Sequence, residues 1–563
     1  MINFDIIRGS IAIILFVLVL KSGLNFFHQK IFELMSNTFL KVVNNLFSFL
    51  IIKTYESNPY RNIREYRTAI SSLVQLETHQ KRNGMKSSSK SNTRFQANSP
   101  PCKRQRKESL TTKLLRNTTG DVCEFISIFG SNAHEMLMKK YKAFGPVYTF
   151  SAFGKKMVFL FEADDVEKLK AAEGRYPQHV DFKHLRRHRE DQGYPKGLLI
   201  SNDNEWLCQR KILSNPMMLK IGHQIKHLEE LTLKTLANAV EDYTINGFGT
   251  FEVEPITRDF AINAFGSVLY GNSFESTFTQ NGKTMQEFAE KAKNNFDDAK
   301  KLLITPECIM KMHPAWKRHN NRWNFLLKTT MDMIERHSND TSDCSILSHL
   351  LQNRKLNDKE IYINLTDLLV ASIDTTNTTL QWCLYELACH PDVQDNIISE
   401  AERILEGRSS LEKTDLDKLE FLSAVLWETL RLHPVGFFTS RIIKDCMEVK
   451  GIMIPPQTNV AISMYVMARN LVLFPNPDKF VPERWMTDNA KIKKLNRDVF
   501  FGFGPRMCLG KKMAEMEMKL FILKFCQQFE FSTDDTEMEQ VVKLLLSPSR
   551  PVKINTVLRQ LTD

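Results

Sequence analysis

One cysteine of this chain lies in a loop whose residue types suit the binding of a metal ion. The loop reads Phe501-Gly-Phe-Gly-Pro-Arg-Met-Cys508-Leu-Gly510, and a strongly helical run follows from Lys511. Its glycines allow turns with positive φ and a close approach of the backbone to a flat group. Free amides and the macrodipole at a helix start stabilise a thiolate. We therefore expect Cys508 to stay deprotonated and to bind a soft metal, because a buried free cysteine in a turn would explain neither the glycines nor Arg506.

A long helix is predicted by the periodicity from Asn357 to His390, with an Asn-Asp start signal and a stop at Pro391. At about 1.5 Å per residue it would be about 50 Å long, enough to cross a whole domain. Its middle, residues 371–379, holds β-branched and Asx residues, which form helices poorly and can hydrogen-bond their own backbone. We expect a local kink with a function there, and the alternative is a Thr-rich helix without chemistry.

Two further sets of residues have helical spacing. Trp206 and Arg210 are an i,i+4 pair, so both side chains share one helix face. Glu428 and Arg431 are an i,i+3 pair on an apolar helix that is predicted over residues 421–432. Arginine on such a face can bind a carboxylate through two parallel hydrogen bonds.

The spacing Phe-x-x-Gly-x-Arg-x-Cys-x-Gly resembles the haem-binding signature of the cytochrome P450 monooxygenases, and all five defined positions match. The resemblance covers about residues 134 to 555. It implies a mainly α fold with small β-sheets, in which a long central helix crosses one large haem-binding domain. It also implies haem b as cofactor, with the Cys508 thiolate as the axial ligand of the iron. The cofactor-binding residues that it implies are Trp206, Arg210, Arg441, Phe501, Arg506, Cys508 and Gly510.

In this family the central helix carries an acid–alcohol pair, which Asp374 and Thr375 match. The resemblance implies that this catalytic pair relays protons to oxygen at the haem. Ser372 stands where the family usually has glycine, so we expect the groove that takes up oxygen to be tighter or more polar. The resemblance also implies haem propionate contacts from Trp206, Arg210, Arg441 and Arg506, and a structural ionic lock formed by Glu428, Arg431 and Arg484.

The implied reaction inserts one oxygen atom of O2 into a lipophilic substrate, sterol-like or xenobiotic, with electrons from NADPH through a redox partner. We expect the pocket between residues 178–196, 368–374 and 435–439, where Phe437 and Phe438 make it apolar. A haem-thiolate ligand-binding or sensor protein without turnover is the alternative function. A membrane-anchored helical scaffold without haem is a third, but it leaves the cysteine loop unexplained.

Several stretches resemble the mitochondrial-type branch of the family, namely residues 173–177, 197–199, 374–376, 430–435 and 508–515. Lys511 and Lys512 occupy a basic pair that faces a ferredoxin in that branch. However, Ser423 and Trp427 stand where the branch usually has further lysines, and the Pro-rich hinge typical of microsomal members is missing. The electron donor is therefore expected to be either ferredoxin-type or a diflavin reductase. The expected location is the mitochondrial inner membrane or the endoplasmic reticulum.

Charge and cysteine content exclude other classes of protein. Residues 1–118 contain nineteen Lys and Arg against six Asp and Glu, whereas the net charge of the whole chain is only +11. The remaining residues are therefore slightly acidic, which argues against nucleic-acid binding. The ten cysteines show no C-x-x-C spacing, so we expect a reduced protein with neither a zinc site nor a disulfide framework.

The N-terminal 118 residues divide into two expected segments. Residues 1–30 are predicted to be a membrane anchor or signal-anchor, because an apolar run from Ile11 to Leu20 extends to Phe27 if Lys21 snorkels. A cleaved signal peptide is the competing interpretation. Residues 31–118 are predicted to be an amphipathic segment and a basic, Ser-rich linker, or a mitochondrial presequence if translation begins at Met85. Residues 119–563 would then form the catalytic domain.

Overall fold

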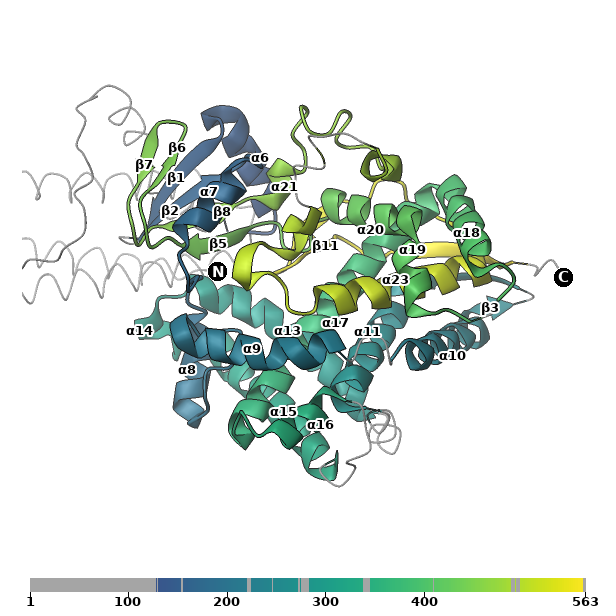
Figure 1. Cartoon of the computed structure of the whole chain (residues 1–563), viewed down its shortest axis with the longest axis horizontal. Coiled ribbons are helices and arrows are strands. Elements are labelled where there is room, and N and C mark those ends of the chain that lie inside the picture. The colour runs from purple at the N-terminus through teal and green to yellow at the C-terminus, as the bar shows by residue number, and fades with distance from the viewer. Residues whose placement is uncertain are drawn as a thin grey trace, which may run out of the picture. The chain divides into compact units, whose positions relative to one another are not determined.

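Figure 1 shows the computed structural model of the chain, which describes residues 128, 130–152, 155–219, 224–245, 247–271, 274, 283–337, 345–408, 410–487, 492 and 497–559. The anchor expected at residues 1–30 and the segment expected at 31–118 lie outside the described residues. In the part of the chain that is described, no helix combines the length and the hydropathy that crossing a membrane requires.

The described body is mainly α-helical, as predicted. Its α-helices are α6 (Ala133–Phe144), α7 (Asp165–Ala172), α8 (Lys183–Gln192), α9 (Asp203–Leu219), α10 (Ile225–Tyr243), α11 (Val253–Tyr270), α13 (Lys283–Ile304), α14 (Glu307–Met310), α15 (Pro314–His337), α16 (Ile346–Asn353), α17 (Asp358–Cys389), α18 (Pro391–Leu405), α19 (Lys413–Lys418), α20 (Glu420–Leu432), α21 (Met464–Met467) and α23 (Lys511–Gln528). Short 3-10 turns are η2 (Pro482–Trp485), η3 (Arg497–Phe501) and η4 (Gly504–Arg506).

The strands form small sheets, which is also as predicted. One sheet has the order β1 (Val147–Ala152), β2 (Lys155–Leu160), β8 (Asn459–Ile462) and β5 (Thr439–Ile442), and a second has the order β3 (Thr244–Ile245), β4 (Phe248–Glu252), β12 (Lys553–Leu558) and β9 (Phe529–Ser532). Two-stranded sheets pair β6 (Met447–Val449) with β7 (Ile452–Ile454), and β10 (Gln540–Val542) with β11 (Leu546–Pro548). Strands β1 and β2 pair antiparallel, and in Figure 1 their sheet lies beside α6 and α7.

The predicted long helix is α17, and its start is fixed by a capping box. The Asn357 side chain accepts a hydrogen bond from the backbone N–H of Glu360, whose carboxylate accepts one from the backbone N–H of Asn357. Its 32 residues run without interruption through the poor helix formers at 371–379. Hydroxyls there bond backward along the helix, as Thr375 Oγ1 does to Ala371 O at 2.8 Å. The helix is therefore continuous through the segment where we expected a kink.

Helix α17 is buried along most of its length, and this packing stabilises a segment whose intrinsic helix propensity is low. It packs against α11, α15, α20 and α23, which supply most of its neighbours. Leu369, Ile373 and Leu380 are fully buried, and each such side chain contributes about 1.5–3 kcal/mol relative to exposure. Tertiary packing thus holds the helix in place under the cavity described below.

The predicted ionic lock is confirmed. Arg431 Nε lies 2.8 Å from Glu428 Oε2 and Arg484 Nε lies 3.0 Å from Glu428 Oε1, and both Glu428 and Arg431 are fully buried. Arg431 also donates to the carbonyl oxygens of Ala468, Pro477 and Lys479. The lock therefore connects α20 to η2 and to residues 468–479, which precede η2. The cysteine loop follows η2 in the chain.

Candidate functional site

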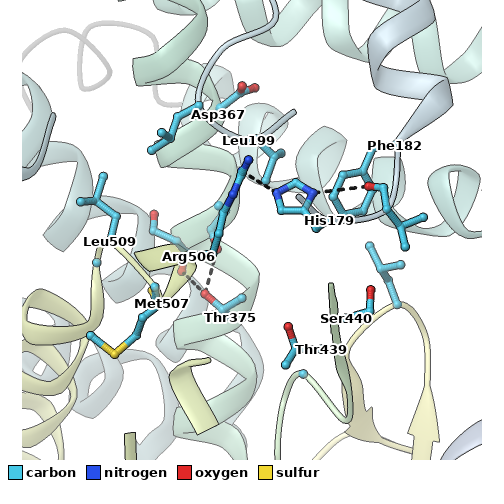
Figure 2. A pocket seen from close by; sticks show the side chains of 18 of the residues that line it. His179, Phe182, Leu199, Asp367, Thr375, Thr439, Ser440, Arg506, Met507 and Leu509 are labelled. Atoms are coloured by element: carbon cyan, nitrogen blue, oxygen red, sulfur yellow. Dashed lines mark hydrogen bonds between the residues drawn. The ribbon is translucent and has the colours of Figure 1, made fainter. Parts of the chain in front are cut away.

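The cysteine loop forms one wall of a cavity of about 570 Å³. Most of the lining is apolar, and it comes from the segment before α8, from α9, α11, α13 and α17, from β5, and from the loop before α23. Phe437 and Phe438 line it as the sequence predicted. Figure 2 shows this cavity with Thr375, Thr439, Arg506 and Met507 on its walls.

The loop holds Cys508 through its own backbone. The Cys508 N–H donates to Phe501 O at 2.8 Å, and the Met507 N–H donates to Gly504 O at 3.1 Å. Gly502 has φ of 89° and Gly504 has φ of 63°, a region that residues with a Cβ rarely adopt. A Cβ on Gly504 would also collide with the Glu173 carboxylate. The two glycines are therefore required by the turn that carries the cysteine.

Cys508 lines the cavity, and two opposing influences act on its pKa. It lies at the start of α23, where the backbone N–H groups of Gly510 and Lys511 bond to it and the charge of Arg210 is close. These contacts lower the pKa, but burial outweighs them, so the pKa of Cys508 lies above its ordinary value. The amides and Arg210 favour the thiolate, and a metal cation bound to the sulfur would favour it further.

Arg210 faces the same cavity with its guanidinium unengaged. It lines the cavity with Cys508, and within the described part of the chain its guanidinium has neither a hydrogen bond nor an ion pair. Burial lowers the pKa of Arg210, while the nearby Cys508 raises it. An arginine in this state is a ready partner for a carboxylate of a bound group.

Arg506 is held by two backbone carbonyls and by the side chains of His179 and Asn202. It donates to Pro177 O at 2.9 Å and to Ser201 O at 2.8 Å, and its guanidinium carbon lies 4.2 Å from the centre of the Trp206 ring. Its Nη1 also lies 2.8 Å from His179 Nε2, and Figure 2 draws this hydrogen bond. Burial and the neighbouring positive charges lower the pKa of Arg506 to about 9. The cavity therefore concentrates positive charge beside the cysteine.

Arg441 lines the cavity too, but most of its donors are engaged by protein groups. Its Nε lies 2.8 Å from Glu173 Oε2, and its Nη2 donates to Phe503 O at 2.9 Å. Its Nη1 donates to Ser440 O and to Thr439 Oγ1. Arg441 thus positions the cysteine loop, and one Nη2 hydrogen remains for a further acceptor.

The implied haem fits these residues. A soft sulfur ligand faces an apolar cavity large enough for a flat ring, and glycines permit its close approach. The uncompensated guanidinium of Arg210 and the indole of Trp206 line the same space, so they suit the carboxylates of a haem. Gly510 lines the cavity, whereas Phe501 does not and contributes its carbonyl to Cys508 instead.

The two predicted catalytic residues face different cavities. Thr375 and Ser372 line the large cavity, whereas the Asp374 side chain lines a smaller one of about 180 Å³ with Glu254 and Lys293. Successive residues on a helix point about 100° apart, which separates them. Burial raises the pKa of Asp374 to about 7, and its Oδ2 has no hydrogen-bond partner among the described residues.

Several further lining residues were not predicted from the sequence. They are Lys300, Asp367 and Glu517, of which Glu517 is 1% exposed and has its pKa raised well above the ordinary value by burial. Asp367 Oδ1 pairs with the buried Arg189 at 2.5 Å. Lys300 has no local sequence pattern that could have identified it, because only the tertiary fold brings α13 to the cavity. His179, by contrast, lies in the segment 178–196, which was predicted to line the pocket.

The comparison with protein families gives one match over most of the chain. The family model described as Cytochrome P450 matches residues 119–556. The matched span includes the cysteine loop, α17 and the ionic lock.

Curated relatives are similar over about three quarters of the chain. A cholesterol side-chain cleavage enzyme, mitochondrial, from Oncorhynchus mykiss is 28% identical over 459 residues, which cover 78% of this chain and 88% of the relative. Cytochrome P450 10 from Lymnaea stagnalis is 28% identical over 451 residues, covering 76% and 81%. A sterol 26-hydroxylase, mitochondrial, from Rattus norvegicus is 26% identical over 460 residues, covering 77% and 86%.

Proposed function

Because the chain belongs to the cytochrome P450 family, and is thus a haem-thiolate monooxygenase, we propose that Cys508 is the cysteine that ligates its haem iron. The observation that supports this most is the placement of the Cys508 sulfur in the wall of an apolar cavity, beside Arg210. The other six described cysteines lie outside that lining. Trp206, Arg210 and Arg506 are proposed to hold the haem carboxylates, with Arg441 contributing its remaining donor.

The bound haem supplies the chemistry that places one atom of O2 in the substrate and releases the other as water. Cys508 would hold the haem iron through its thiolate, a ligand that would make the iron richer in electrons. The Gly510 and Lys511 amides stabilise the negative sulfur, and Arg210 adds its charge nearby. The apolar lining around Phe437 and Phe438 excludes water, so protons must arrive by a defined route.

We propose that Asp374 and Thr375 supply those protons from the smaller cavity. Asp374 has a pKa of about 7, so near neutral pH it can both take up and release a proton. Thr375, the next residue on α17, presents its hydroxyl to the large cavity. That hydroxyl now donates to Ala371 O at 2.8 Å, so it must exchange this bond to pass a proton onward. Ser372 lines the same cavity, and its hydroxyl donates to Leu369 O at 2.8 Å.

The proposed substrate is lipophilic, sterol-like or xenobiotic, because the cavity lining is mainly apolar. The proposed electron donor is ferredoxin-type, with NADPH as the source and the mitochondrion as the compartment, because two of the relatives above carry the word mitochondrial in their names. Lys512 supports this, since it is exposed next to the cysteine loop. Association with the mitochondrial inner membrane is proposed on the same ground.

One experiment tests the ligand. The Cys508→Ser variant should lose the thiolate-type spectrum of the reduced CO complex while its far-ultraviolet circular dichroism stays near that of the wild type. Cys208→Ser, at an exposed position of α9, is the matched control and should keep the spectrum. A thiolate spectrum that survives in Cys508→Ser rules out this assignment.

A second experiment tests turnover and the donor together. Product formation from a sterol is measured in two reactions that both contain NADPH. One contains a ferredoxin system and the other contains a diflavin reductase. We expect turnover with the ferredoxin system. A normal CO spectrum without oxygen consumption in either system would instead indicate a ligand-binding or sensor protein.

A further inference from the structure

The large cavity carries a lysine on a part of its wall that is built from other elements than the cysteine loop. Lys300 belongs to α13, and it lines the cavity together with Leu303 of the same helix. Val542 and Leu544, from β10 and the turn that follows it, line the cavity as well. The residues beside Cys508 come from α9 and from the start of α23. One cavity thus combines a haem-binding wall with a second wall that holds a cation.

The Lys300 ammonium is only partly satisfied. An ammonium group has three donors, and Lys300 uses one of them in a hydrogen bond to Val542 O. In the described residues it has no ion pair. The acid whose charge acts on it is Asp297 of the same helix, but that residue is exposed and lines the smaller cavity. Burial consequently lowers the pKa of Lys300, because the charged form loses hydration without gaining a counter-ion.

The other ionisable side chains that line the cavity have partners or belong to the cysteine wall. Asp367 is paired with Arg189 at 2.5 Å, and His179 is bonded to Arg506 at 2.8 Å. Glu517 lies on α23, and burial raises its pKa well above the ordinary value. Among the described residues, Lys300 is therefore the charged lining residue with open donors outside the haem-binding set.

We propose that Lys300 binds an anionic, oxygen-rich head group of the substrate, and that the substrate is consequently an amphiphile with a carboxylate or a sulfate. This inference rests on the proposed function, in which the cavity takes up a lipophilic substrate. The apolar body of such a molecule would lie against Phe437, Phe438 and Leu368, which line the remaining space. The carbon that is oxidised would then be remote from the head group.

Physical chemistry favours an anion over a neutral group at this position. A charge-assisted hydrogen bond is shorter and about twice as strong as a neutral one, and it strengthens further where little water is present. A pure hydrocarbon would leave the Lys300 ammonium dehydrated against apolar atoms, which is costly. The polar end of the substrate is therefore selected by the lysine, and its body is selected by the apolar walls.

The test measures binding to the haem-loaded protein with two matched pairs of probes. Hexadecanoate is compared with methyl hexadecanoate, and cholesterol sulfate is compared with cholesterol, by equilibrium dialysis at pH 7.4. The wild type should bind the anion at least about 10-fold more tightly than its neutral partner in one pair or both. Preference in the first pair indicates a fatty-acid body, and preference in the second indicates a sterol body.

Variants of the lysine decide whether Lys300 is responsible. Lys300→Met keeps the length of the side chain and removes its charge, so the ratio of anion to neutral affinity should fall by about 10-fold to 100-fold. Lys300→Arg should retain most of that preference. Lys301→Met changes the neighbouring residue on α13, which does not line the cavity, and it should leave the ratio unchanged.

The outcomes separate this inference from the proposed function. If the wild type binds neither anion more tightly than its neutral partner, or if Lys300→Met keeps the preference, the assignment of Lys300 is wrong. The monooxygenase function would still stand if the CO spectrum is of the thiolate type and a neutral sterol is oxidised. A wild-type protein that shows neither the thiolate-type CO spectrum nor sterol oxidation would instead contradict the proposed function.

Discussion

Two arginines, Arg431 in the ionic lock and Arg210 in the cavity, differ in how many of their donors the protein satisfies. Arg431 uses all its N–H donors, on the Glu428 carboxylate and on the carbonyl oxygens of Ala468, Pro477 and Lys479. Arg210, in the cavity, has no protein partner for its guanidinium among the described residues. A fully bonded arginine serves the fold, because nothing else can be added to it. An arginine without protein partners is free to bind a ligand. The number of protein partners therefore distinguishes the structural Arg431 from Arg210, the proposed ligand-binding residue.

Breaking the lock should have the largest effect on stability. Arg431→Ala leaves the Glu428 carboxylate buried with less compensation, and three carbonyl oxygens lose a donor, so the free energy of unfolding should fall by about 3–5 kcal/mol. Urea unfolding of the haem-loaded protein measures this loss. Lys418→Ala, at an exposed position of α19, is the control and should change stability by less than about 1 kcal/mol. A loss that small in Arg431→Ala would refute a structural role for the lock.

Removing Arg210 should have the opposite pattern. Arg210→Met takes away a cation that the apoprotein does not use, so the stability of the apoprotein should stay the same or rise slightly. Haem should bind more weakly by about 1.5–3 kcal/mol, or roughly 10-fold to 100-fold, because a charge-assisted hydrogen bond is lost. The rate of haem transfer to apomyoglobin measures this change. Equal losses of apoprotein stability in Arg210→Met and Arg431→Ala would erase the distinction between the two arginines.

The contrast also shows which features a sequence can predict. The lock was predictable because Glu428 and Arg431 lie one helical turn apart and carry a recognisable pattern. The helix α17 was predictable because its cap and its length are local properties. The pairing of Arg441 with Glu173 was not, because 268 positions separate them and only the tertiary fold brings them together.

Burial is the other quantity that the sequence hides. The helix-start amides around Cys508 were predictable and do lower its pKa, but the sequence does not reveal the desolvation that outweighs them. The same holds for Asp374, which the sequence groups with Thr375 although the helix directs the two side chains into different cavities. Patterns identify residue types at a site, whereas directions and hydration come from the packed structure.

One group of buried polar side chains is neutral and lies between α8 and α15. His184, His188 and His319 pack with ring centres 5.1 Å and 6.4 Å apart, and neither ring nitrogen of His319 has a hydrogen-bond partner among the described residues. Burial lowers the pKa of His184 to about 3 and that of His188 to about 4, from an ordinary value of 6.5. Arg189, Arg322 and Lys183 oppose protonation as well, whereas Asp181 and Asp191 favour it.

These histidines should make the protein sensitive to acid. Between about pH 6.5 and pH 4 the unfolded chain binds more protons than the folded one, so the free energy of unfolding falls as the pH is lowered. The stabilisation is fully present above pH 6.5, and about 1–2 kcal/mol per histidine should be lost at pH 5. Urea unfolding at pH 7 and pH 5 measures the loss. His319→Phe should reduce it, whereas His227→Gln, on α10, should not; an unchanged loss in His319→Phe would exclude this origin.

The smallest effect is expected at the surface, where the same contrast recurs between two adjacent lysines. Lys511 is half-buried and lies 2.5 Å from Asp498 and 3.7 Å from Glu515, whereas Lys512 is exposed and has no ion pair in the described part of the chain. Lys512→Ala should therefore lower kcat/KM for a ferredoxin-type donor by about 2-fold to 5-fold, through slower association that depends on salt. Lys511→Ala should change it less, because its charge is already offset by two carboxylates. A larger effect at Lys511 would mean that the electron donor binds a lysine that is already paired with carboxylates. In that case an unpaired charge would not indicate a functional residue at the surface.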